Sequence, residues 1–248
     1  MNEEAISLGW RCETAQLGVS LGKRGTRNHG YKTCPFDLLN TNYVGVCKAI
    51  EDDFKYFTDP EHLKVVNGTF CSEHFGMYNT SKIENQIVNT YYGFVFNHES
   101  PGHGNLYLNE RWAGGINHYV DNNFAKFIER YDQRINNFRN YIDKSEKVNF
   151  LLMRYNAIPT ELCEVISKKH PSLDFEIFNF YNYSKYTYDL TKKKDDEAVH
   201  NWEKNQWEVM GININEYPEE YARYDRKLLT EEDINNTQFD KRIHLKLV

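Results

Sequence analysis

The sequence lacks the features that mark membrane, secreted and nucleic-acid-binding proteins. No segment approaches the ~20 apolar residues that a membrane span needs. The first residues include Glu3 and Glu4 and do not show the basic-then-apolar pattern of a signal peptide. The formal net charge of −6 gives no general attraction to nucleic acid or anionic lipid. We therefore expect a cytoplasmic protein with neither a nucleic-acid nor a membrane partner.

The cysteines also lack a recognisable pattern. Their number is odd and their spacing irregular, which argues against a disulfide framework, and no CxxC pair is present; they lie at positions 12, 34, 47, 71 and 163. No two candidate ligands have the short spacing that structural zinc sites use, so we expect no metal and no cofactor. Reduced thiols in a reducing compartment are the simplest interpretation.

What is present predicts one folded α/β domain. The chain has 248 residues, of which 40% are hydrophobic and 15% aromatic, and it shows no internal repeat or clear linker. The apolar stretches 148–156 and 173–182 are typical of strands, and Pro159 opens a helix between them. Strand, helix and strand with short connections form a βαβ unit, which implies a parallel pair. We predict a mainly parallel central sheet with helices on both faces.

The domain is expected to span residues 1–215, followed by a polar C-terminal tail over 216–248. Its other predicted elements are a strand over 5–8, helices over 12–21, 123–142 and 200–212, a helical stretch between 34 and 57, a strand over 91–96 and a glycine-rich loop over 99–115.

Cys12 has the sequence context of a reactive thiol. In AISLGWRCETAQLGVSLGK, residues 5 to 23, a short apolar strand is broken by Gly9, and Cys12 then begins a helix. Free N–H groups in a first helical turn stabilise a thiolate, and they can also receive the oxyanion of a tetrahedral intermediate. The competing interpretation is a small buried hydrophobic residue at a helix start, and the local pattern favours neither. Cys47 and Cys163 sit in apolar helical patterns and are expected in the core.

A cysteine nucleophile needs an imidazole to accept its proton. His98 is the best candidate because it directly follows the strand YYGFVFN, where its side chain would be held at a sheet edge. His103 and His118, in or just after the glycine-rich loop, are the next candidates, and a purely structural histidine is the alternative for each.

The chain resembles a bacterial, viral and plant family of uncharacterised proteins described as putative papain-like cysteine peptidases. The matching pieces include SLGWRC, PFDLL, YGFVFNH and LLMRYN, and they occur in order over roughly residues 5 to 212. The resemblance implies Cys12 as nucleophile, His98 as base, Asp37 as an orienting carboxylate and Arg154 as a substrate-binding residue. The family usually has an Asp after the histidine and a Trp in the second motif, where this chain has Glu99 and Leu38.

Two other functions fit the same features. The strand–turn–cysteine–helix opening is also similar to capsule-polysaccharide acyltransferases that use coenzyme A. A binding module that keeps the pocket without the chemistry is the third hypothesis. We expect a cysteine-dependent hydrolase acting on a peptide or other acyl substrate, with the acyltransferase as its main alternative.

Overall fold

A four-stranded parallel sheet forms one end of the protein. The computed structural model describes residues 3–9, 12–70, 81–103, 105–153, 158–181 and 239–247. The strands of this sheet lie in the order β1-β5-β6-β7, and every neighbouring pair is parallel. Their bounds are Glu3–Ser7 for β1, Lys147–Met153 for β5, Asp174–Tyr181 for β6 and Ile243–Leu247 for β7. The predicted parallel sheet is confirmed.

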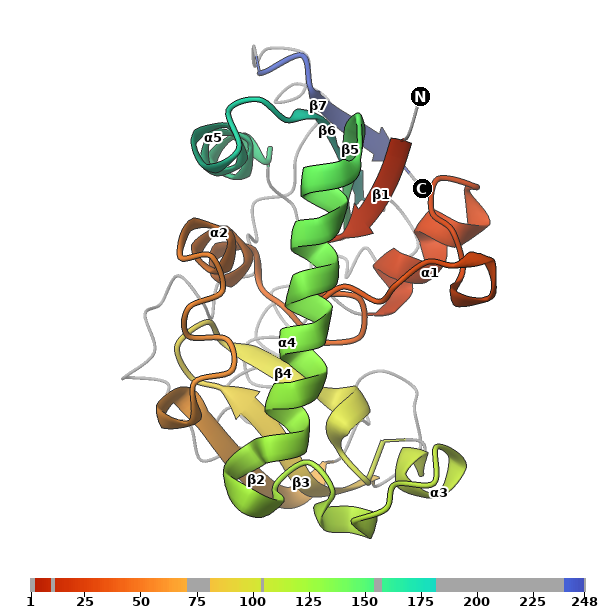
Figure 1. Cartoon of the computed structure of the whole chain (residues 1–248), viewed down its shortest axis with the longest axis vertical. Helices are drawn as coiled ribbons and strands as arrows, with labels where there is room; N and C mark the ends of the chain where they lie inside the picture. The colour runs from red at the N-terminus through yellow and green to blue at the C-terminus, as the bar shows by residue number, and fades with distance from the viewer. Residues whose placement is uncertain are drawn as a thin grey trace, which may run out of the picture.

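Helices cover both faces of this sheet, as the nearly continuous apolar sequence of β5 requires. Val148, Phe150 and Leu152 point into the main core, whereas Leu151 packs on the opposite face with Leu17. Leu17 belongs to α1 (Cys12–Ser20), which therefore covers that second face. The main core is covered by α2 (Tyr43–Glu51), α4 (Asp121–Lys144) and α5 (Thr160–Lys169), on the other side of the sheet from α1 (Figure 1).

The βαβ prediction is correct: β5 and β6 pair in parallel and α5 lies between them in the chain. The long helix was expected over 123–142, and α4 spans Asp121–Lys144. Its residues 122–124 have positive φ, so regular helical geometry begins after them.

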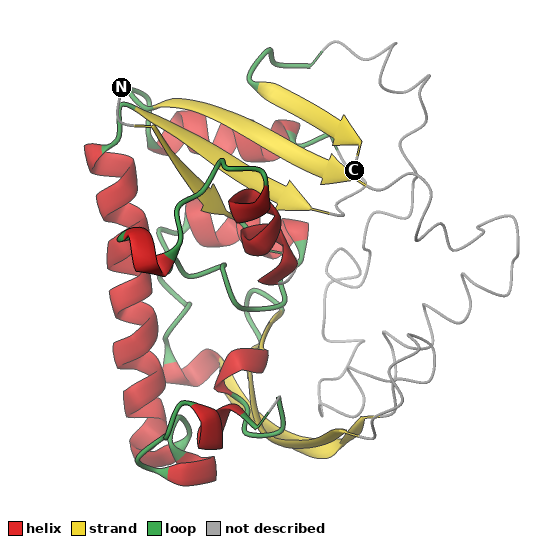
Figure 2. Cartoon of the chain, turned by 90° about the vertical axis from the view of Figure 1, so that its right-hand side faces the viewer, coloured by secondary structure: helices red, strands yellow, loops and turns green. Residues whose placement is uncertain are grey.

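The fold also contains an antiparallel sheet that the sequence only partly predicted. Its order is β2-β3-β4, with bounds Leu63–Phe70, Ser81–Asn89 and Phe94–Phe96. It lies at the far end of the molecule from the parallel sheet, and α4 runs along both (Figures 1 and 2). The shorter elements are η1 (Arg27–His29), η2 (Pro60–His62), η4 (Asn97–Glu99), α3 (Leu106–Asn109) and η5 (Gly115–Asn117).

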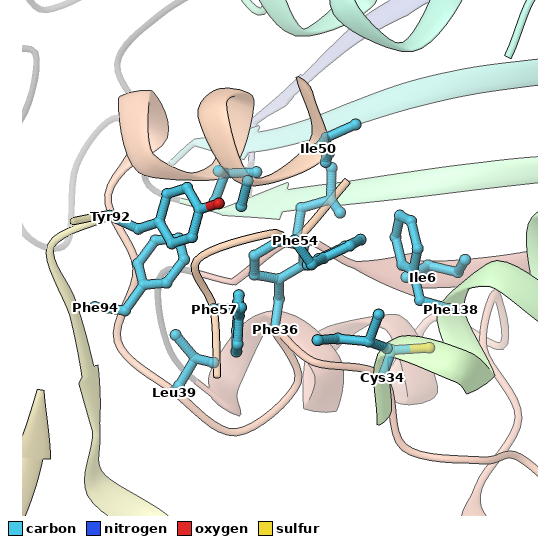
Figure 3. Close-up of a cluster of buried hydrophobic side chains, with 14 of the residues drawn as sticks. Ile6, Cys34, Phe36, Leu39, Ile50, Phe54, Phe57, Tyr92, Phe94 and Phe138 are labelled. Carbon is cyan, nitrogen blue, oxygen red and sulfur yellow. The ribbon is translucent and has the colours of Figure 1, made fainter. Parts of the chain in front are cut away.

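Aromatic side chains join these two ends into a continuous core. The Phe36 ring has its centroid 5.9 Å from that of Phe94 in β4 and 6.3 Å from that of Phe138 in α4. Figure 3 shows Phe36 among Phe54, Phe57 and Phe94, with Ile6 and Phe138 alongside. The segment that carries Phe36 is therefore fixed by contacts with the antiparallel sheet and with α4.

The C-terminal residues differ from the predicted polar tail. Residues 243–247 form β7, which pairs with β6, and Ile243 is buried in the main core. The ring of His244 stacks on that of Phe178, with centroids 4.7 Å apart. These residues are therefore part of the α/β unit. The predicted helix over 200–212 falls outside the described residues.

Candidate active site

Cys12 is the first residue of α1, as the sequence predicted. The preceding strand β1 ends at Ser7, and Leu8 still donates its N–H to the carbonyl of Leu151 in β5. The chain then turns at Gly9, whose φ is +96°. Cys12 is thus just beyond the carboxyl end of a parallel strand, the edge at which α/β proteins place their sites.

Side chains hold the turn before Cys12 in place. The Thr14 hydroxyl donates to the carbonyl of Gly9, and the Gly9 N–H donates to the Ser7 hydroxyl at 3.2 Å. Thr14 and Ser7 are both fully buried. Gly9 is therefore tied both to the end of β1 and to the first turn of α1, the helix that carries Cys12.

The remaining described cysteines have the environment of core residues. Cys34 is inaccessible to solvent, and Cys47 and Cys163 are nearly so, whereas Cys12 is half-buried. Burial raises the pKa of the Cys34, Cys47 and Cys163 thiols. The prediction that Cys47 and Cys163 are core residues is confirmed. Among the described cysteines, Cys12 alone combines partial exposure with a helix N-terminus; Cys71 lies outside the described residues.

His98 follows β4, as predicted, and lies in the short turn η4. It is half-buried, and its ring centroid is 4.8 Å from that of the exposed His103. Burial lowers the pKa of His98, and the neighbouring His103 lowers it further. A histidine in this environment is neutral at pH 7 and can therefore accept a proton. His118 lies elsewhere, with its ring centroid 4.6 Å from that of Tyr119.

The partners of Asp37 in the described part of the chain are Arg24 and the Cys34 backbone, so its predicted role as the carboxylate that orients His98 stays a prediction. The Asp37 carboxylate is fully buried and accepts hydrogen bonds from the Arg24 guanidinium at 2.7 Å and from the backbone N–H of Cys34 at 2.8 Å. Burial raises the pKa of Asp37, and the charge of Arg24 opposes that effect. Arg24 also donates to the carbonyl of Ala15 in α1 at 3.3 Å. Asp37 therefore stabilises, through Arg24, the helix that begins with Cys12.

Glu99 does not pair with His98. Its side chain is inaccessible to solvent and forms ion pairs with Arg130 at 2.9 Å and with Arg134 at 3.2 Å. The Tyr131 hydroxyl donates to its second oxygen at 2.9 Å. Among the described residues, His98 thus makes no hydrogen bond to either carboxylate. The role of the two arginines was not predicted from the sequence. Their positions next to Tyr131 and one turn after it, along the apolar stripe of α4, did indicate that they could face inward.

Arg154 lies outside the described residues, and the pairing of Cys12 with His98 remains a prediction. In the described ranges, His, Cys, Asp and Glu side chains form no group of three or more that could hold a metal ion. No helix in the described part of the chain has the length and apolar character that crossing a membrane requires.

A family comparison gives this site its context. The family model described as "putative papain-like cysteine peptidase" matches residues 3–185, a range that contains Cys12 and His98. The chain belongs to this family. No curated protein and no solved structure matches the chain. Membership in this family supports a coarse function for the chain, that of a cysteine hydrolase.

Proposed function

We propose that the protein is a cysteine hydrolase in which Cys12 is the nucleophile and His98 the base. The observation that carries the proposal is the position of Cys12: half-buried, first in α1, and directly beyond the end of β1. The buried thiols of Cys34, Cys47 and Cys163 could not reach a substrate without unfolding.

The proposed reaction has two stages. The Cys12 sulfur attacks the substrate carbonyl carbon while its proton passes to a ring nitrogen of His98. The resulting oxyanion accepts hydrogen bonds from backbone N–H groups in the first turn of α1. His98 then donates its proton to the leaving group as the carbonyl–leaving-group bond breaks, which leaves a thioester on Cys12. Water, losing a proton to His98, attacks the thioester and releases the acid and the free enzyme.

The environment of His98 supports its assignment as a base without a carboxylate partner. A carboxylate beside an imidazole would stabilise the protonated ring, whereas burial and His103 favour the neutral ring. The proton would therefore start on the Cys12 thiol and move to His98 during attack. Arg154 stays a proposal as the group that binds an anionic part of the substrate.

The second candidate is an acyltransferase, favoured by the parallel sheet with its cysteine after the first strand. The same thioester would form from coenzyme A-bound acyl groups, and a sugar hydroxyl would replace water in the second stage. The non-catalytic binding module is the third candidate. It predicts an unreactive Cys12.

The deciding experiment is the rate at which iodoacetamide labels each cysteine, measured against pH by peptide mass mapping. If the helix start and His98 lower the Cys12 pKa from about 8.5 to about 7, the thiolate at pH 6 increases about 30-fold. A thiolate of lower pKa is also about fivefold less nucleophilic, so the labelling rate at pH 6 should rise by about sixfold in all. His98→Ala should remove the part of that gain that His98 supplies, and Cys34 should stay unlabelled in the folded protein. Faster labelling of Cys34 or Cys71 than of Cys12 at pH 6 would show that the nucleophile is wrong.

Two probes separate the candidates once Cys12 is shown to react. A peptide vinyl sulfone should alkylate Cys12 in a peptidase and compete with iodoacetamide. Coenzyme A should bind tightly to the Cys12→Ala variant if the protein is a transferase, because only that function needs a pocket for this donor.

A further inference from the structure

The turn that carries His98 has little support from its own strand. β4 contains three residues, Phe94–Phe96, and pairs with β3 on one side. On its other side, Val95 and Asn40 form an isolated bridge with reciprocal backbone hydrogen bonds of 2.9 and 3.0 Å. The next residues form η4, Asn97–Glu99, and no side chain caps its start. Something beyond the strand must therefore fix the direction in which His98 points.

Glu99, the next residue along, supplies a strong attachment. One carboxylate oxygen takes both ion pairs, with the Nε of Arg130 and the Nη1 of Arg134, and the other accepts the Tyr131 hydroxyl. All three partners come from adjacent turns of α4. Charge-assisted contacts of this kind are strong when they are excluded from water, and Glu99 is fully so.

The same helix residues are themselves rigidly held. The Tyr131 ring packs on Phe96, the last residue of β4, with centroids 4.8 Å apart. Phe127 lies one turn earlier in α4, and its ring centroid is 4.7 Å from those of Phe96 and Tyr131. Glu99 is thus bound to the stretch of α4 that also packs against the end of β4. The η4 turn is therefore held by ion pairs through Glu99 and by ring contacts through Phe96.

We propose that Glu99 is a positioning residue for His98: its buried carboxylate fastens the η4 turn to α4 and so fixes where the imidazole points. This inference rests on the proposed role of His98 as the base of Cys12. The charge of Glu99 raises the pKa of His98, but burial and His103 lower it by more, so the ring still favours its neutral state. The length of the glutamate side chain matters for this role, because an aspartate is one methylene shorter and would have to pull the η4 turn toward α4 to keep all three contacts.

The test uses the full chain and the labelling of Cys12 by iodoacetamide against pH. The variants are Glu99→Asp, His98→Ala and their double mutant. Glu129→Gln is the matched control, because Glu129 is an exposed acid of α4 whose ion pair is with Lys126. Thermal melts followed by circular dichroism confirm that each variant is folded before labelling.

We expect Glu99→Asp to slow labelling at pH 6 as much as His98→Ala does, by up to about sixfold, and to move the labelling midpoint upward toward about pH 8.5. The double mutant should be no slower than His98→Ala, since a residue that acts through His98 cannot matter once His98 is gone. Glu129→Gln should label like the unaltered protein.

Wild-type labelling in folded Glu99→Asp, or defects that multiply in the double mutant, would overturn the inference while leaving the proposed base intact. Unchanged labelling in His98→Ala would overturn both. If Glu99→Asp does not fold, Tyr131→Phe replaces it, since it keeps the ion pairs and removes one hydrogen bond. Tyr131→Phe must then slow labelling, and must do so only when His98 is present.

Discussion

Replacing Gly9 by alanine should strongly destabilise the protein at the turn before Cys12. Gly9 has φ +96°, a region in which a side chain costs about 1–2 kcal/mol. A Cβ at this position would lie 2.2 Å from the Thr41 hydroxyl oxygen and 2.8 Å from its methyl carbon. Overpacking of this kind costs about 1–3 kcal/mol. The two effects together predict a loss of about 2–5 kcal/mol in the free energy of unfolding.

Gly30→Ala is the matched control, because Gly30 has φ +89° but a Cβ added there would meet no atom within 4 Å. It should lose only the conformational part, about 1–2 kcal/mol. Thr41→Ala in the Gly9→Ala background should recover part of the steric loss, but the Thr41 Cβ, 3.0 Å away, would remain.

Urea denaturation of the wild-type protein and these three variants gives the differences directly, and each kcal/mol should lower the Tm by about 2–4 °C. A Gly9→Ala variant no less stable than Gly30→Ala would refute the steric explanation. Displacement of the turn should also slow Cys12 labelling, which Gly30→Ala should leave unchanged.

Two further predictions concern the thiols and pH. Cys12→Ser should abolish turnover with little loss of stability. Cys163→Ser puts a hydroxyl in the core and should cost about 1–3 kcal/mol in thermal or urea melts unless Asp240, which contacts the thiol, accepts its hydrogen bond. The reverse order of stability would make Cys12 a packing residue. Because burial and then His103 lower the pKa of His98, the acid limb of kcat/KM should lie below pH 6.5, since the base is active when neutral. His103→Ala removes one of these causes and should move that limb upward, while His29→Ala, an exposed histidine, should not move it.

The sequence predicted those parts of the fold that depend on local patterns. The apolar runs of β5 and β6, with Pro159 between them, specify strand, helix and strand within a few residues of the observed bounds. Gly9 and the helical spacing after Cys12 likewise located the junction that carries the thiol. The mixed polar sequence of β2 gives no such pattern, because an antiparallel strand of this kind is stabilised by its neighbour.

The carboxylates could not be assigned from the sequence for a different reason. A buried acid pairs with whichever cation the tertiary fold brings to it. For Asp37 that cation is Arg24, on the loop that follows α1, and for Glu99 it is a pair of arginines, Arg130 and Arg134, on the distant helix α4. The separation in sequence between each acid and its arginine does not indicate that the two will pair. The prediction that Asp37 lies beside the histidine therefore rested on the family resemblance alone.

The position of β7 has a practical consequence for preparing the protein. The family match ends at residue 185, yet β6 is hydrogen-bonded along Ile177–Tyr181 to the strand at 243–247. A chain shortened to the matched range would keep the pairing of β6 with β5 but leave its other edge unpaired beside Phe178 and Phe180, and an unprotected apolar edge is a template for aggregation. Loss of solubility in such a fragment would report the missing edge strand, and it would say nothing about whether the catalytic residues lie within the fragment.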